Sequence, residues 1–244
     1  MSQTMTPDLI KMLAEGIREL NFDATEEQIQ QFNHYYELLM EWNEKMNLTA
    51  ITEPEKIITH HFLDSISCAK APGFFEATQV LDMGTGAGFP GIPLQIMFPQ
   101  QHYVLMDSLA KRVTFLETVI KRLGLAQVKL YHARAEQAGR NTQHREQYRL
   151  AVSRAVAALP VLLEYVIPLL KVGGRFCCQK GPRWREELDD AEKAMKEFNV
   201  VVAEIRTVDI PYTDLKHTLI VFQKTGATSF KYPRRPGIPS KKPL

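Results

Sequence analysis

The chain has 244 residues, enough for one substantial domain or for a domain with a modest appendage. An apolar fraction of 45% and a charged fraction of 24% exclude a disordered chain and are typical of a globular protein. The formal net charge of +2 does not by itself indicate a polyanionic partner, but residues 223–244 contain six lysines and arginines and no acidic residue. The positive charge is therefore concentrated at the carboxyl end.

The cysteines and the apolar runs bear on the cellular compartment. Cys68, Cys177 and Cys178 lack metal-ligand spacing, and we expect buried free thiols in a reducing environment rather than a disulfide or a metal site. The amino terminus has no apolar core of signal-peptide length, and no run reaches the roughly 18 apolar residues of a membrane span. These features predict a soluble, cytoplasmic protein.

The first 75 residues are predicted to form a helical segment packed on the rest of the chain. Thr25-Glu-Glu-Gln is a capping-box pattern, and apolar side chains recur after it at helical spacing, from Ile29 to Trp42. A second helix is predicted over residues 54–70, where Ala71-Pro-Gly ends it.

From residue 79 onward, short apolar runs alternate with helical patterns. We predict strands over residues 79–83, 102–107, 128–133, 148–155, 175–181, 201–210 and 217–224. We predict helices over residues 90–97 and 109–123, an apolar helix ending at Leu170, and a charged helix over residues 183–198. Strands separated by helices imply a mostly parallel sheet, and the last two strands, with no helix between them, imply an antiparallel hairpin at one edge.

The domain organisation follows from these patterns. Residues 76–224 are predicted to form an α/β, Rossmann-like domain with a seven-stranded, mostly parallel sheet. Residues 225–244 are rich in proline, glycine and basic residues, and we predict an extended basic tail there.

The sequence GTGAGFPG follows the first predicted strand and fits two patterns. Gly86, Gly88 and Gly91 match the spacing of a dinucleotide-binding loop. Gly84, Gly86 and Gly88, preceded by Asp82, match the first loop of a methyl-transfer fold. A strand that turns sharply into a helix needs positive φ, and a ligand lying against the backbone leaves no room for Cβ. The glycines alone therefore do not choose between the ligands.

The acids that flank this loop favour one of the two ligands. Asp107 ends the second predicted strand and suits a ribose in either case. Asp82 would place negative charge beside a pyrophosphate, which is unfavourable, whereas the ammonium and sulfonium groups of S-adenosylmethionine would attract it. We therefore expect S-adenosylmethionine as the cofactor rather than NAD.

The target of methylation is narrowed by what the sequence lacks. Amino methylation of adenine or cytosine commonly uses an Asn/Asp-Pro-Pro-aromatic loop after the fourth strand, where residues 153–156 read Ser-Arg-Ala-Val. Cytosine C5 chemistry needs an exposed thiol, and Cys177 and Cys178 lie in a predicted core strand. Guanine N7 has a free lone pair and needs neither device, so orientation of the base can carry much of the catalysis.

Eight segments occur in an order and at a spacing that resemble a known family over nearly the whole chain. They are WNEKMNLTAIT (42–52), HFLDS (61–65), VLDMGTGAGFPGIPL (80–94), MDSLAKRVTFL (106–116), Arg134-Ala135-Glu136, SRAVA (153–157), Lys180-Gly181 and KYPRRPGIPSKKPL (231–244). The chain resembles the bacterial 16S ribosomal RNA guanine-N7 methyltransferases, known as the glucose-inhibited division protein B family. The resemblance implies a class I methyltransferase fold and S-adenosylmethionine-dependent methylation of guanine N7 in 16S ribosomal RNA, expected at guanine 527.

The resemblance also implies a set of cofactor-binding residues. The set is Asp82, Gly84, Gly86, Gly88, Phe89, Asp107, Ala135, Glu136 and Arg154. Asp107 is expected near the ribose, Ala135 and Glu136 around the adenine, and Arg154 against the cofactor or the target guanine. Three members have other interpretations: Phe89 as a hydrophobic staple, Glu136 as a helix N-terminal charge, and Arg154 as a structural ion pair.

Arg154 and Asn47 are the candidate catalytic residues. We expect Asn47 and His61 to line the pocket, although a helix-capping Asn47 and a packed core His61 are equally good interpretations. No further metal ligands accompany His60 and His61, so no metal site is predicted. Replacement of Arg154 by alanine is expected to lower methyl transfer before it affects folding.

The candidate RNA contacts are cations. They are Lys111, Arg112, Lys180, Lys231, Arg234 and Arg235. Lys111 and Arg112 start a predicted helix, where the helix dipole disfavours cations, so contact with phosphate would explain them; a solvated helix face explains them nearly as well. The tail cations would make binding salt-dependent, and Tyr232 could stack on a base; a solubilising tail is the alternative.

The expected partner is 16S ribosomal RNA or the small ribosomal subunit, with no membrane, no metal and a monomeric chain. Two other functions stay open on the residues alone. An S-adenosylmethionine enzyme acting on a small molecule or a protein would leave the basic tail unexplained. A nicotinamide-dependent reductase would leave Asp82 unexplained.

Overall fold

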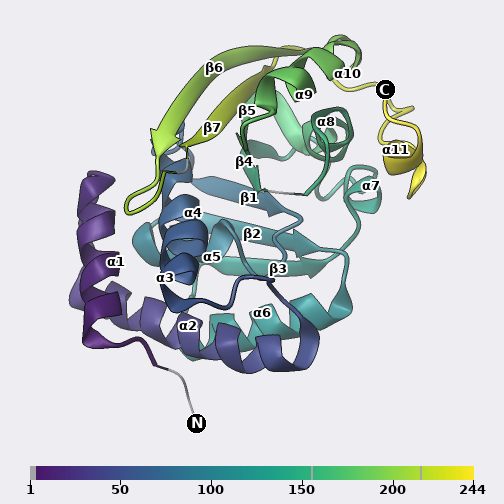
Figure 1. Ribbon diagram of the computed structural model, residues 1–244. Helices are drawn as coiled ribbons and strands as arrows, with labels where there is room; N and C mark the ends of the chain where they lie inside the picture. Colours follow the sequence, from purple (N-terminus) through teal and green to yellow (C-terminus); the bar gives the residue numbers. More distant parts are fainter. Residues whose placement is uncertain (1–3, 155, 215) are drawn as a thin grey trace.

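A seven-stranded sheet organises the computed structural model, which describes residues 4–154, 156–214 and 216–244 (Figure 1). The strand order is β3-β2-β1-β4-β5-β7-β6. The strands are β1 (Gln79–Met83), β2 (His102–Asp107), β3 (Val128–His132), β4 (Tyr148–Arg154), β5 (Leu170–Lys180), β6 (Val200–Asp209) and β7 (Lys216–Lys224). β1 to β5 pair in parallel, and β7 runs antiparallel to both β5 and β6. The predicted mostly parallel sheet with an antiparallel hairpin at its edge is confirmed.

Helices cover both faces of the sheet. They are α1 (Pro7–Glu19), α2 (Glu26–Met46), α3 (Pro54–Ile57), α4 (Asp64–Ser67), α5 (Gly91–Met97), α6 (Ala110–Leu123), α7 (Ala135–Ala138), α8 (Leu159–Val166), α9 (Trp184–Asp190), α10 (Glu192–Glu197) and α11 (Ile238–Lys241). Successive strand residues point to opposite faces, so Val80 joins a core with α2, α5 and α6, whereas Leu81 joins a core with α8 and α10. Burial on both faces explains the nearly continuous apolar runs of the central strands.

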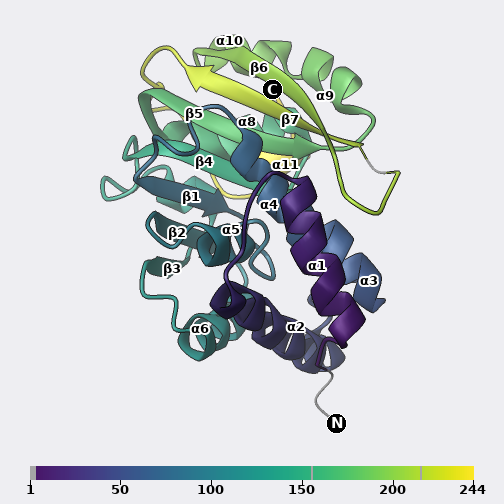
Figure 2. The same ribbon diagram turned by 90° about the vertical axis from the view of Figure 1, so that its left-hand side faces the viewer.

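The N-terminal helices form an outer layer over α5 and α6 (Figure 2). The predicted capping box begins α2: the Gln28 amide donates to the Thr25 hydroxyl, and the Thr25 amide donates to the Gln28 side chain. Farther along α2, the Tyr35 hydroxyl donates to the Ala87 carbonyl at 2.5 Å. This layer therefore contacts the glycine loop directly.

The run from residue 54 to residue 70 is helical but is not the single α-helix that we predicted. Between α3 and α4 lies a π-helical segment, Ile58–Leu63, and a 3-10 turn, Cys68–Lys70, ends the run. π-helical turns are rare and frequently occur at functional sites. Here the segment carries His60 and His61 toward the end of β4, where the His60 carbonyl accepts a hydrogen bond from Arg154.

Two predicted helices end differently in the structure. The helix expected to reach Leu170 stops at Val166 and continues as a 3-10 turn, Ile167–Leu169, because Pro168 has no amide hydrogen with which to extend an α-helix. The predicted helix over residues 183–198 is divided at Ala191 into α9 and α10. Ala155, the last residue of the predicted fourth strand, lies outside the described residues.

The carboxyl-terminal segment is not extended, and that prediction was wrong. The segment folds back beside α7 and α8 and contains α11 (Figure 1). The Tyr232 side chain is buried and packs edge-on against Phe198, with ring centroids 4.9 Å apart. Composition predicted a solvated segment, but one buried aromatic ring and the ion pairs described below give the segment a fixed position.

Candidate functional site

A cavity of about 570 Å³ lies at the carboxyl ends of β1, β2 and β4. Sheets of this type bind ligands at that edge, where the strand order reverses, and the volume is in the range of small-molecule sites. Seven of the predicted cofactor-binding residues line the cavity: Gly84, Gly86, Phe89, Asp107, Ala135, Glu136 and Arg154. Asp82 and Gly88 are absent from the described lining.

The glycine loop is held by hydrogen bonds to the neighbouring strand. The amides of Gly84 and Thr85 donate to the Met106 carbonyl, at 2.9 and 3.1 Å. The Gly86 amide donates to Asp107 Oδ2 at 2.9 Å. Gly86 has a φ of +61°, and a Cβ added there would meet nothing within 4 Å, because the residue borders the cavity. The loop backbone therefore forms an open wall against which a ligand can lie.

Asp82 lies behind this loop and does not face the cavity, which corrects the expected contact with the cofactor. Its side chain is fully buried, and Oδ2 accepts hydrogen bonds from the Gly91 amide at 2.8 Å and from the Thr85 hydroxyl at 2.7 Å. Burial raises the pKa of Asp82 to about 7, against the lowering effect of these two donors. The carboxyl group thus stabilises the turn from β1 into α5.

The position of Asp82 still argues against a dinucleotide. A pyrophosphate is normally held by the free amides at the start of the helix that follows the loop. Here the Gly91 amide donates to Asp82, and the Ile92 amide donates to the Gly88 carbonyl at 2.7 Å. The donors that would hold a phosphate are already used, so the cavity fits a nucleoside ligand without phosphate.

Gly88 has a packing role. Its φ is +103°, and an added Cβ would lie 2.7 Å from both the Tyr35 hydroxyl and the Ile92 side chain. The glycine is therefore required by the close approach of α2 to the loop and not by the ligand.

Asp107 and Glu136 place two carboxylates along the cavity. Asp107 accepts hydrogen bonds from the amides of Gly86 and Leu109, both at 2.9 Å, and the Arg112 guanidinium lies 3.6 Å from its Oδ2. A carboxylate so placed can accept further hydrogen bonds from ribose hydroxyls. Glu136 lies in the first turn of α7, and its Oε1 accepts a hydrogen bond from the Gly237 amide at 2.9 Å. The tail segment therefore reaches the cavity, which sequence reasoning missed.

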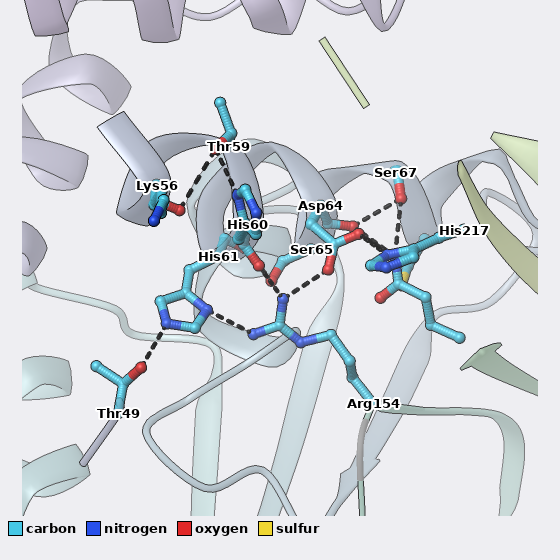
Figure 3. Close-up of polar contacts among 12 residues, drawn as sticks. Thr49, Lys56, Thr59, His60, His61, Asp64, Ser65, Ser67, Arg154 and His217 are labelled. Carbon is cyan, nitrogen blue, oxygen red and sulfur yellow. Dashed lines mark hydrogen bonds and ion pairs between the residues drawn. The ribbon is translucent and has the colours of Figure 1, made fainter. Parts of the chain in front are cut away.

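Arg154, at the end of β4, is held by several groups from the helical run of residues 54–70 (Figure 3). Its Nη1 donates to the His60 carbonyl and to Asp64 Oδ2, both at 2.7 Å, and Nη2 donates to His61 Nδ1 at 3.1 Å. Its guanidinium also lies over the Phe89 ring, 5.0 Å from the centroid. The ion-pair interpretation of Arg154 is confirmed, and the residue also lines the cavity.

Asp64 is the centre of this cluster and carried no role in the sequence analysis. Its side chain is buried and accepts hydrogen bonds from Arg154, from Gln179 at 2.5 Å, and from His217 at 2.5 Å (Figure 3). These partners come from β4, β5 and β7, which are far apart in the sequence. Only the position of Asp64 within the HFLDS segment could have drawn attention to it.

His61 is neutral and has both ring nitrogens in hydrogen bonds. Burial and the neighbouring Arg154 guanidinium lower the pKa of His61 to about 3. Because Nδ1 accepts from Arg154, Nε2 carries the proton and donates to the Thr49 hydroxyl at 2.8 Å. The ring stacks on Phe89 with centroids 4.5 Å apart. His61 therefore both lines the cavity, as expected, and packs as a wall residue.

A second cavity of about 770 Å³ adjoins the first. His61, Arg154 and Val156 line both cavities, so they form the shared wall. The second cavity has a strongly charged rim, formed by Lys180, Arg183, Glu186, Glu187 and Asp190. Its size suits a nucleobase with its sugar, and its charges suit a polar target.

Other predicted site residues lie elsewhere. Asn47 is exposed, ends α2 with a φ of +47°, and is absent from the described lining of both cavities, which corrects its expected catalytic role. The capping interpretation is the one that the structure supports. Leu48 and Thr49, the next two residues, do line the cofactor cavity.

The predicted RNA-contacting cations fall into two groups. Lys111 and Arg235 are exposed, and Arg112 is partly exposed at the mouth of the cavity. Lys180 donates to the Glu187 carboxylate at 2.7 Å and Arg234 donates to Glu164, so both already have acidic partners. Lys231 is exposed and pairs with Glu197. The buried Tyr232 is unavailable for stacking on a base, so that expectation was wrong.

The remaining chemistry of the described residues is limited. Cys68, Cys177 and Cys178 are buried free thiols, as predicted, and burial raises the pKa of each. Within residues 4–154, 156–214 and 216–244, no group of three metal-ligating side chains comes together. The same residues include no helix that is both long and apolar enough to cross a bilayer.

A family model described as rRNA small subunit methyltransferase G matches residues 28–215. The chain belongs to the rRNA small subunit methyltransferase G family. The ribosomal RNA small subunit methyltransferase G of Alkaliphilus metalliredigens (strain QYMF) is 49% identical to it, over 96% of this chain and 98% of that protein. The protein of the same name from Acetivibrio thermocellus is 46% identical, over 97% of each chain. The family resemblance found in the sequence is confirmed.

The fold is shared with solved structures of much lower sequence identity. A chain solved in work on the conversion of a disulfide bond into a thioacetal group during echinomycin biosynthesis has a TM-score of 0.50. It is 15% identical, over 66% of this chain and 82% of that chain. As a member of the methyltransferase G family with a Rossmann-like methyltransferase fold, the chain is an S-adenosylmethionine-dependent enzyme, as expected.

Proposed function

We propose that this enzyme transfers the methyl group of S-adenosylmethionine to N7 of guanine 527 in cytoplasmic 16S ribosomal RNA. The two adjoining cavities carry the proposal. The first has a glycine wall and two carboxylates, and the Gly91 and Ile92 amides at the start of the following helix are already bonded within the protein. The second has a charged rim. Because Arg154, His61 and Val156 line both, a base in the second cavity is adjacent to a ligand in the first.

S-adenosylmethionine, when bound, supplies an electrophilic methyl group on a positively charged sulfur. The chain's own residues hold it by complementary groups. Gly86 offers open backbone and Gly84 lines the cavity beside Val156. Asp107 accepts from the ribose hydroxyls, and Ala135 and Glu136 border the adenine. Each of these assignments is part of the proposal and is supported by the position of the residue in the lining.

The shared wall supports an acceptor that needs no deprotonation. His61 is neutral with both nitrogens occupied, and the cysteines are buried, so the wall offers neither a ready base nor a thiolate nucleophile. Guanine N7 attacks through an existing lone pair. Arg154, fixed by Asp64 and His60, then acts by orienting the base, because a precise approach is worth several orders of magnitude in rate.

The charge of the second cavity is compatible with methylation at N7. Methylation at N7 leaves the base with a positive charge, whereas methylation of an amine loses a proton and leaves a neutral product. Glu186, Glu187 and Asp190 line this cavity and favour the developing positive charge. The described lining also includes Asp64 and three cations, Arg154, Lys180 and Arg183, so four carboxylates face three cations there.

Transfer of labelled methyl groups tests the proposal. The protein is incubated with methyl-labelled S-adenosylmethionine and either protein-free 16S ribosomal RNA or small ribosomal subunits, and the RNA is digested to nucleosides. The label is expected in 7-methylguanosine, and RNA carrying adenine in place of guanine 527 should remain unlabelled. Label in another nucleoside, or in protein, would refute the proposal. A Cys178→Ala variant should retain transfer, since that thiol is buried.

A further inference from the structure

Part of the carboxyl-terminal segment borders the cofactor cavity. Gly237 and Ser240 are among its lining residues, next to Glu136 and Tyr165. The Gly237 amide donates to Glu136 Oε1 at 2.9 Å, and a hydrogen bond with Ser240 opposes the burial that raises the pKa of Tyr165. These contacts lie on the α7 side of the cavity. Glu136 and Gly237 are 101 residues apart in the sequence.

A buried ion pair fixes the segment three residues before Gly237. Glu164, on α8, is fully buried, and Arg234 donates to it from its backbone amide at 2.7 Å and from Nε at 3.0 Å. Arg234 Nη2 donates to the second carboxylate oxygen at 2.5 Å. Such charge-assisted, two-oxygen contacts are strong and directional, and loss of the arginine would leave a buried carboxylate without its counter-charge.

Two further arginines hold the stretch that leads into this pair. Arg145 donates to the carbonyls of Thr228 at 2.7 Å and Tyr232 at 2.8 Å. Arg140 Nε donates to the Pro233 carbonyl at 2.9 Å. The backbone of the segment is thus fastened by side chains that precede β4, and α11 lies beside α7 and α8 (Figure 1).

We propose that residues 233–241, here named the carboxyl-terminal wall, complete the nucleoside end of the S-adenosylmethionine cavity. In this arrangement Arg234 is a positioning residue that acts through Glu164, not an RNA contact. The wall narrows the cavity mouth beside Glu136 and excludes water from the adenine. This inference rests on the proposed assignment of Ala135 and Glu136 to the adenine end.

A wall of this kind couples the docking of the carboxyl-terminal segment to the binding of the cofactor. If the docked wall contacts the cofactor, docking raises cofactor affinity, and bound cofactor must stabilise the docked wall by the same factor. Typical couplings of this kind are about 5- to 150-fold. This coupling distinguishes a segment that contacts the cofactor from one that only packs nearby. A segment that only packs nearby would change the stability of the protein but not the affinity of the folded protein for S-adenosylmethionine.

Calorimetric titration of S-adenosylmethionine into full-length variants tests the coupling. Arg234→Gln and Glu164→Gln each remove one charge of the pair and should raise the Kd about tenfold. Arg122→Gln, at an exposed position on α6 outside the cavity lining, should leave the Kd within about twofold of wild type. Leu13→Ala, in the buried contact of α1 and outside the cavity lining, should lower stability without changing the Kd.

Hydrogen exchange of the unmodified protein gives a second readout. Saturating S-adenosylmethionine should slow exchange in the peptide that spans residues 233–241, including the Gly237 amide. If this exchange is unchanged by the cofactor, the wall proposal is overturned even if the variants fail to fold. Wild-type affinity in a folded Arg234→Gln variant would overturn it as well. If the wild-type protein does not bind S-adenosylmethionine at all, the cofactor assignment fails, and the wall proposal with it.

Discussion

A single buried carboxylate governs how the turn between β1 and α5 meets its ligand. Asp82 accepts hydrogen bonds from Gly91 and Thr85 from behind the loop, and its Oδ1 has no hydrogen-bond partner among the described residues. An ionised carboxylate with one unsolvated oxygen is costly, which agrees with the raised pKa. We infer that Asp82 disfavours a phosphate at this site because it holds the Gly91 amide, although its own side chain lies outside the cavity lining.

The raised pKa of Asp82 predicts a specific pH dependence of stability. The pKa is about 7 in the folded protein against an ordinary value of 3.8, so the folded protein holds this proton more tightly than the unfolded chain. The resulting stabilisation is fully present below about pH 4 and is lost as the pH rises through about 7. Asp82→Asn should remove this dependence, by on the order of a few kcal/mol, since one pKa unit corresponds to about 1.4 kcal/mol.

Urea unfolding of wild type and variant across this pH range measures the effect. The wild type should lose free energy of unfolding relative to Asp82→Asn as the pH rises from about 4 to about 7. Asp23→Asn, at an exposed position, is the matched control and should track the wild type. A constant difference between wild type and Asp82→Asn would show that Asp82 titrates normally.

Arg154 combines an orienting role with a structural one, so the choice of substitution matters. Alanine would leave the buried Asp64 with Gln179 and His217 as its described side-chain partners. Both folding and activity would then suffer, which corrects the expectation that methyl transfer would fall before folding is affected. Arg154→Lys keeps the charge but cannot reproduce the planar contacts with His60 and His61.

We expect Arg154→Lys to lower kcat/KM for methyl transfer by about 100-fold and the free energy of unfolding by about 1–3 kcal/mol. Steady-state transfer assays and urea titration measure the two effects. Arg149→Lys, on the same strand but exposed, should change neither. A wild-type rate in the Arg154→Lys protein would contradict the orienting role.

At the scale of the elements, the glycine loop has two faces with different requirements. Gly86 faces the cavity, and Gly88 lies against Tyr35 of α2 and Ile92 of α5, which leave no space for a side chain. One GxGxG pattern thus serves a ligand at one glycine and helix packing at the other. Both positions are glycine in the sequence because the backbone has a positive φ at each.

Alanine substitutions should separate these two requirements. Gly86→Ala should cost about 1–2 kcal/mol of stability from its left-handed backbone and should weaken S-adenosylmethionine binding, because its methyl group projects toward the cavity. Gly88→Ala should cost more stability, on the order of several kcal/mol, since backbone strain adds to overlap with Tyr35. Thermal unfolding and calorimetric titration with S-adenosylmethionine distinguish the two variants. Equal losses of stability in Gly86→Ala and Gly88→Ala would contradict the packing role of Gly88.

At the scale of the whole molecule, the basic tail divides into inward and outward cations. Arg234 faces Glu164, whereas Arg235 and Lys241 are exposed near the rim of the cofactor cavity. The small net charge of +2 thus conceals a local positive surface. We propose that RNA contacts this positive surface, beside the proposed site of methyl transfer.

The outward cations should set the salt dependence of RNA binding. A double Arg235→Gln/Lys241→Gln variant should reduce the slope of log K against log salt by roughly 0.7 to 0.9 for each phosphate that the protein no longer neutralises. Its Kd for S-adenosylmethionine should stay unchanged. Lys11→Gln, at an exposed site on α1, is the control. An unaltered slope in the double variant would mean that RNA binds through another surface.

Much of the fold could be predicted because its signals are local. Most strands were found nearly to the residue, since a run such as residues 103–106 must be apolar to be buried on both faces. β5 is the exception, because it begins at Leu170, five residues before the predicted start. The π-helical segment and the docked tail were missed, because both depend on partners distant in the sequence. Asp64 and Glu164 were missed for the same reason: a single acid on a helix gives no pattern until its arginine is seen beside it.

The sequence by itself determined the sheet, the glycine turn and the family, because periodicity and short motifs are properties of neighbouring residues. Only the tertiary structure decided which way each charge faces. In the tertiary structure, Asp82 accepts a hydrogen bond from the Gly91 amide behind the loop, outside the cavity lining, and Arg234 pairs with the buried Glu164. The physical reason is that a charged side chain binds whatever opposite charge or donor the fold brings near it, and burial makes that choice strong.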